Sequence, residues 1–192
     1  MLQAASTAKL LIAGQAPGRK VHATGVPWND ASGDRLRAWL QIDRATFYDA
    51  ARVAIVPMGL CYPGAAASGG DRPPRRECAP LWHARLLDAL RDVRCTLLVG
   101  QYAQKHYLRA ARKSTLTETV RTFAAYGPRF FPLPHPSWRS VAWMRQNPWF
   151  EERVLADLRA AVHALVQPSD VCAVPHSARR IGRIVEPAAV KD

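Results

Sequence analysis

The chain has 192 residues, of which 48% are hydrophobic and 22% charged, and this balance predicts one globular domain with a single buried core. No apolar run approaches the roughly 18 to 20 residues of a membrane-spanning helix, which excludes a helical membrane protein. The formal net charge of +12 favours a polyanionic partner, although a generally basic protein would carry the same excess.

Short apolar runs alternate with amphipathic stretches along the chain. The first run, 9–13, ends at a glycine, and no cleavage site follows it, so it predicts a core strand in a cytoplasmic protein, near the nucleoid in a bacterium. Further apolar runs predict strands over 53–56, 95–99 and 129–133. Apolar residues spaced three to four apart predict helices over 32–40, 80–90, 101–110 and 148–165.

Particular residues support these helices. Asn147 followed by Pro148 is typical of a helix start, with an N-cap and then proline at the first helical position. We expect His83 and His106 to lie on helix surfaces without a functional role. The side chains expected to face the core are Leu36, Trp39, Leu40, Leu81, Leu86, Leu87, Leu90, Phe150, Val154, Leu158, Val162 and Leu165.

Strands that alternate with helices predict an α/β fold, a three-layer α/β/α domain around a central, mostly parallel four-stranded sheet. We assign this domain to residues 1–167 and expect residues 168–192, which lack periodicity, to form a flexible tail. Gly14, Pro57 and His135 follow three of the predicted strands. Because such sheets bind ligands at the carboxyl ends of their strands, the sequence predicts a site there.

Two segments carry the candidate chemistry: residues 14–18 (GQAPG), continued by 24–34 (TGVPWNDASGD), and residues 133–139 (LPHPSWR). The Asp30 carboxylate could orient a water molecule or stabilise a developing positive charge, and it could equally be a simple helix cap. His135, between two prolines, could donate to a developing anion, or it could be a turn histidine bonded to the backbone.

Together these segments resemble the two active-site motifs of the uracil-DNA glycosylase superfamily. The resemblance implies a monofunctional enzyme that hydrolyses the N-glycosidic bond of uracil, and of other deaminated bases, in DNA, leaving an abasic site for base excision repair. Ala16 stands where the best-known branch has the Asp that activates water. A branch with Ala there uses a later Asp, which by similarity is Asp30, with Asn29 and Asp34 as competitors.

By the same resemblance, Trp28 stacks on the extruded base, although a core aromatic is the alternative reading. His135 donates a hydrogen bond to the leaving base, Trp138 wedges into the duplex, and Arg139 meets phosphate. Further DNA contacts are expected at Gly18, Ser32 and Ser137.

The base pocket is expected to contain Gln15, Ala16, Trp28, Pro57, Met58 and Tyr62. Pro57 departs from the family pattern, because close relatives have at this place an Asn that reads the edge of uracil. Proline has neither a side-chain amide nor a backbone N–H. The sequence therefore predicts a permissive pocket that accepts other deaminated or modified bases.

Cys61 and Cys78 resemble half of the four-cysteine iron–sulfur site of one branch, but no cysteine precedes Cys61. A [4Fe–4S] cluster needs about four thiolates, so we expect a branch without the cluster and no metal or organic cofactor. Cys95 is expected to be a core thiol, and Cys172 falls in the predicted tail. We also expect a monomer.

Two other functional classes remain open. Replacement of the family's Asp by Ala16 and of its Asn by Pro57 fits a module that grips damaged or single-stranded DNA without turnover. An unrelated thiol enzyme built on Cys61 or Cys78 is a third class, although no histidine partner follows a matching strand.

Overall fold

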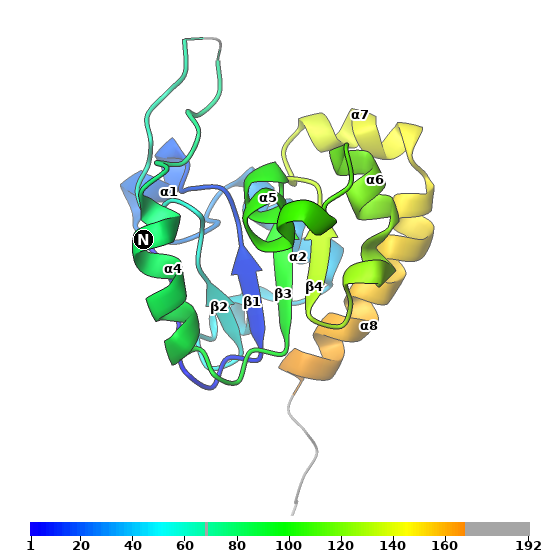
Figure 1. Cartoon of the computed structure of the whole chain (residues 1–192), viewed down its shortest axis with the longest axis horizontal. Helices are drawn as coiled ribbons and strands as arrows, with labels where there is room; N and C mark the ends of the chain where they lie inside the picture. The colour runs from blue at the N-terminus through cyan, green and yellow to red at the C-terminus, as the bar shows by residue number, and fades with distance from the viewer. Residues whose placement is uncertain (68, 168–192) are drawn as a thin grey trace, which may run out of the picture.

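The computed structural model describes residues 1–67 and 69–167, so the predicted tail lies outside the described residues. The centre is a sheet of four strands, β1 (Leu10–Ala13), β2 (Val53–Ile55), β3 (Cys95–Val99) and β4 (Phe130–Leu133). They lie in the order β2-β1-β3-β4, and every pair is parallel (Figure 1). The predicted fold class and the positions of the four strands are confirmed.

Helices cover both faces of the sheet. In Figure 1, α4 and α5 lie in front of the strands and α2 lies behind them, which makes three layers. The helices are α1 (Arg19–Thr24), α2 (Ala31–Leu40), α3 (Arg44–Tyr48), α4 (Cys78–Ala89), α5 (Gln101–Leu108), α6 (Leu116–Arg121), α7 (Arg139–Gln146) and α8 (Leu155–Val166).

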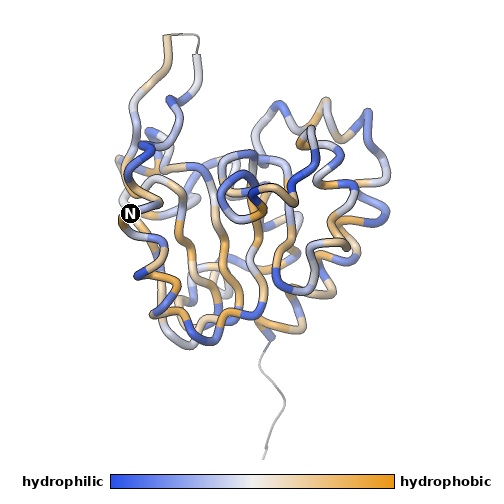
Figure 2. Tube along the Cα trace, in the orientation of Figure 1, coloured by the Kyte–Doolittle hydropathy of each residue, from blue (hydrophilic) through white to orange (hydrophobic). Residues whose placement is uncertain are grey.

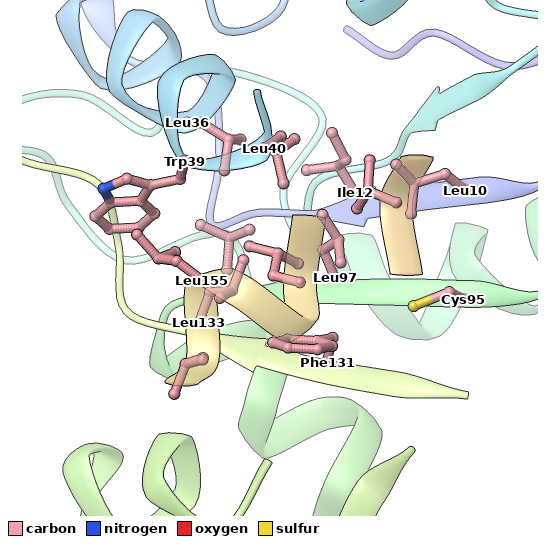
Figure 3. Close-up of a cluster of buried hydrophobic side chains, with 14 of the residues drawn as sticks. Leu10, Ile12, Leu36, Trp39, Leu40, Cys95, Leu97, Phe131, Leu133 and Leu155 are labelled. Atoms are coloured by element: carbon pink, nitrogen blue, oxygen red, sulfur yellow. The ribbon is translucent and has the colours of Figure 1, made fainter. Parts of the chain in front are cut away.

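The core lies on both sides of the sheet because successive strand residues point to opposite faces. On one face, Leu10 and Ile12 pack with Leu36 and Leu40 of α2, all of them fully buried (Figure 3). On the other face, Leu11 belongs to a separate buried cluster beneath α4. The strands are accordingly the most hydrophobic part of the trace (Figure 2).

The helix starts show how local chemistry sets the boundaries. The N-cap of α2 is Asp30, whose side chain accepts a hydrogen bond from the Gly33 amide. The last helical segment begins after Asn147, as predicted, runs through a π-helical turn at Phe150–Val154 and continues as α8. The Asn147 side-chain oxygen accepts from the Trp149 indole and not from a backbone amide.

Two expectations for α4 are wrong. Leu81 is 62% exposed, whereas His83 is only 1% exposed. The helix turns His83 inward because the imidazole finds two polar partners there: Nε2 lies 2.9 Å from the Pro57 carbonyl oxygen, and Nδ1 lies 3.1 Å from the Tyr107 hydroxyl oxygen. A carbonyl only accepts, so Nε2 carries the proton and Nδ1 accepts from the hydroxyl. Burial lowers the pKa of His83, opposed by its bond to Pro57.

Candidate active site

The carboxyl ends of the strands open into a cavity of about 620 Å³. Strand order reverses between β1 and β3, and open parallel sheets bind ligands at such a reversal. The walls come from the loop after β1, the start of α2, the turn after β2 and the loop after β4. The predicted site residues that line the cavity are Gln15, Ala16, Gly18, Trp28, Asp30, Ser32, Pro57, His135, Ser137, Trp138 and Arg139.

Asp30 lines this cavity, and only one of its carboxylate oxygens accepts a hydrogen bond from residues 1–67 or 69–167. Its Oδ1 accepts the Gly33 amide hydrogen at 2.8 Å. Its Oδ2 lies 4.0 Å from the point that a Cβ would occupy at Gly18, so it faces the loop after β1. Asp30 can therefore cap α2 and act on a substrate at the same time, because the bond to Oδ1 fixes the carboxylate while Oδ2 faces the cavity.

Trp28 has a backbone conformation that is rare for a bulky residue. Its φ is 55°, in the left-handed region that costs a non-glycine residue about 1–2 kcal/mol. Packing holds it there, since its carbonyl accepts from Arg37 at 3.4 Å and lies where Gly33 alone leaves room. The indole packs against Gly14, and its ring centroid lies 5.7 Å from that of His135. In this conformation the indole lies beside His135, and both residues line the cavity.

The loop that carries His135 is anchored from two helices. Arg35 of α2 donates to the Pro136 carbonyl at 2.9 Å. Gln104 of α5, which is fully buried, donates to the Leu133 carbonyl at 2.9 Å. The backbone on either side of His135 is therefore held by one helix from each face of the sheet.

His135 is set up as a neutral hydrogen-bond donor. Burial lowers its pKa, and the charges of Asp30 and Asp71 oppose this effect. Its ring nitrogens make no hydrogen bond to residues 1–67 or 69–167, so an N–H is left for a ligand. A preorganised donor in such a cavity stabilises negative charge as it develops.

Three predicted site residues are not brought to the cavity. Asn29 turns toward α3, where its side-chain oxygen accepts from Arg44 at 3.1 Å. Met58 is buried in a hydrophobic cluster with residues of β3 and α5. Tyr62 lies beside His22 of α1, with the ring centroids 6.0 Å apart.

Trp138 and Arg139 form the rim of the cavity. Trp138 is 73% exposed, and the Arg139 guanidinium lies 5.1 Å from the centroid of its ring. An exposed indole beside a cation has the chemistry to meet both a base and a phosphate.

Sequence reasoning missed two charged residues that shape this site. Asp71, from the long loop between β2 and α4, also lines the cavity, beside Gly18 of the motif after β1. Arg35 holds the His135 loop, as described above. No motif distinguishes either residue in the sequence, because each reaches the site through tertiary placement.

Among the described residues, Cys61, Cys78 and Cys95 do not line the cavity. Cys61 and Cys78 carry free thiols, and Cys95 is buried as predicted, with burial raising its pKa to about 11. Within the described residues, no three or more His, Cys, Asp or Glu side chains are grouped to hold a metal ion. In the same part of the chain, no helix has the length and apolarity to cross a membrane.

Fold and site together define an α/β/α domain whose cavity combines a carboxylate, a neutral imidazole and an indole at the carboxyl edge of a parallel sheet. Residues 3–159 match the family model described as Uracil DNA glycosylase superfamily, and the chain belongs to this superfamily. Membership supports a DNA glycosylase-like, hydrolytic function in DNA repair, with DNA as the partner.

Proposed function

We propose that this protein is a monofunctional uracil-DNA glycosylase that hydrolyses the N-glycosidic bond of uracil, and of related deaminated bases, and leaves an abasic site. The observation that carries the proposal is the meeting of Asp30 and His135 in one cavity, from loops more than one hundred residues apart, with the Trp28 indole beside the imidazole. The protein acts as a monomer in the cytoplasm, where chromosomal DNA is its substrate.

Asp30 stabilises the sugar during bond cleavage. As the bond between C1′ and the base nitrogen lengthens, positive charge develops on the sugar, and Asp30 Oδ2, the oxygen that does not cap α2, stabilises it. Opposite unit charges at 4 Å attract by about 4 kcal/mol at an effective dielectric of 20. A water oriented by the same oxygen then bonds to C1′ and gives its proton to the carboxylate. Asn29, engaged with Arg44, is not the group that holds this water.

His135 stabilises the leaving base. The electron pair of the broken bond departs with the base, whose carbonyl oxygen becomes negative and accepts the imidazole N–H. A neutral imidazole can fill this role, because burial lowers its pKa and the neutral ring still carries one N–H to donate. The anionic base takes up a proton on release, which completes the hydrolysis.

Trp28, Pro57 and Ala16 shape the choice of base. The indole supplies a stacking platform, which contributes about 1–3 kcal/mol per base. The Pro57 carbonyl already accepts from His83, and neither Pro57 nor Ala16 has a polar side chain with which to read the edge of uracil. The pocket therefore tolerates other deaminated or modified bases, and a panel with hypoxanthine, xanthine and 5-hydroxymethyluracil checks this. Activity on uracil alone would contradict it.

The test uses the purified protein in excess over a labelled uracil oligonucleotide, with abasic sites revealed by alkali. Asp30→Asn keeps the side-chain oxygen that caps α2 but removes the charge, and Asp30→Ala removes both. We expect both variants to slow cleavage at least about a hundredfold, which is about 2.7 kcal/mol of transition-state stabilisation. Asp88→Asn, in the last turn of α4, is the control that changes net charge equally.

Two results would redirect the proposal. An unchanged rate in Asp30→Asn would keep the glycosylase and move the carboxylate role to another residue. A binding module is the second candidate, favoured by Ala16 and Pro57 standing in the cavity where the motif resemblance expects an acid and an amide. Tight binding of uracil-containing DNA without abasic product, from uracil or from the panel, would establish that candidate.

A further inference from the structure

The loop between β2 and α4 brings a second carboxylate to the cavity. Asp71 forms an isolated antiparallel bridge with Ala65, and the neighbouring Arg72 amide donates to the Gly64 carbonyl at 2.8 Å. The Gln15 side-chain amide lies 3.5 Å from the Arg72 carbonyl oxygen, which ties this loop to the motif after β1. Asp71 is therefore held by backbone contacts although its side chain is exposed.

The two carboxylates converge on one point. A Cβ built at Gly18 would lie 3.3 Å from Asp71 Oδ2 and 4.0 Å from Asp30 Oδ2. Both oxygens are thus within reach of the same small volume beside Gly18. The charge of each also acts on His135, which shares the cavity with them.

Within the described residues, no ion pair neutralises the Asp71 carboxylate. The ion pairs within 1–67 and 69–167 join Arg37 to Asp34 and Arg52 to Asp49, and the Asp71 carboxylate accepts no hydrogen bond in that part of the chain. An uncompensated carboxylate at the mouth of a DNA-binding cavity weakens the attraction for phosphates. Such a charge is useful where a cation forms during the reaction.

We propose that Asp71 is a second catalytic carboxylate, which shares with Asp30 the stabilisation of the cationic sugar and the orientation of the attacking water. The inference rests on the proposed glycosylase activity. Bond changes are those of the hydrolysis above: water bonds to C1′, the base leaves with the electron pair, and the water proton passes to one of the two carboxylates.

The test separates catalysis from binding in Asp71→Asn. We expect the single-turnover rate on the uracil oligonucleotide to fall about 10- to 100-fold. We expect the Kd for DNA that carries a cleavage-resistant 2′-fluorinated deoxyuridine to stay equal or decrease, because a negative charge near the phosphates is removed. The Asp88→Asn control should change neither quantity.

A second readout does not depend on activity. The charged side chains that share the cavity with His135 are Asp30, Asp71 and Arg139, and the negative charge of Asp71 raises the pKa of His135. Removing that charge should therefore lower the pKa of His135, which the NMR shifts of its imidazole follow. Three results would each overturn this inference without contradicting the glycosylase activity. They are an unchanged rate in Asp71→Asn, a rate that falls together with weakened binding, and an unchanged His135 pKa. Absence of product from the wild type on every base would overturn both.

Discussion

Replacing Gly33 with alanine tests whether packing, and not local preference, holds Trp28 in its left-handed conformation. In an open helix this change stabilises by about 0.5–1 kcal/mol. Here the new Cβ would lie 1.7 Å from the Trp28 carbonyl oxygen and 2.9 Å from the Trp28 Cβ. The carbonyl must move by more than about an ångström, because non-bonded carbon and oxygen atoms do not approach that closely.

That movement disturbs two neighbouring interactions. It weakens the hydrogen bond from the Gly33 amide to the Asp30 cap, which contributes about 0.5–2 kcal/mol. It also breaks the bond from Arg37 to the Trp28 carbonyl. We expect Gly33→Ala to lower the free energy of unfolding by about 1–3 kcal/mol. Displacing the indole from the cavity should also slow uracil excision about 10- to 100-fold, the equivalent of one lost base-stacking contact.

Urea denaturation and single-turnover cleavage measure the two effects. The control is Ala38→Gly on the exposed side of the same helix, which should cost about 1 kcal/mol of stability and leave the rate unchanged. A Gly33→Ala protein that is more stable than the wild type and equally active would refute the claim that this glycine shapes the site.

Three further predictions concern individual side chains. Burial places the folded-state pKa of His135 below its unfolded value near 6.5, so the unfolded chain binds the proton first and stability falls as pH drops below about 6.5. Urea denaturation at about pH 7 and pH 5 measures this loss of stability. His135→Gln should make the loss smaller, and an equal loss would contradict the prediction. His83→Phe leaves the Pro57 carbonyl and the Tyr107 hydroxyl without partners, so the urea midpoint should reveal a cost of about 1–3 kcal/mol, where a neutral outcome would argue against the buried bonds. Trp138→Ala should leave stability within about 0.5 kcal/mol but slow excision from duplex more than from single-stranded DNA, and equal slowing on both would speak against a wedge.

The sheet could be predicted because its strands are short, continuous apolar runs that end at glycine or proline. Helices α1, α3 and α6 have only five or six residues, too few for a helical period to show. Leu81 and His83 were predicted wrongly because hydrophobicity was weighed above spacing. His83 lies three, four and seven residues before Leu86, Leu87 and Leu90, which puts it on their face of the helix, and its polar partners in the interior allow it to be buried there.

The candidate site was predictable where its residues belong to a recognisable local motif. Asp30 and His135 belong to compact segments with glycine and proline, and the structure brings both to one cavity. Asp71 could not be found in this way, because its approach to Gly18 depends on the path of a long loop. Asn29 could not be separated from Asp30 either, since only the fold shows that it turns to Arg44.

The most direct measurement of the central claim is detection by mass spectrometry of free uracil and an intact abasic strand after the protein is incubated with a uracil-containing oligonucleotide. The site geometry predicts stoichiometric release of uracil by the wild type, with strand breaks appearing only after alkali. Stable binding of the same DNA with no free uracil, and none of the other deaminated bases released, would contradict the glycosylase assignment.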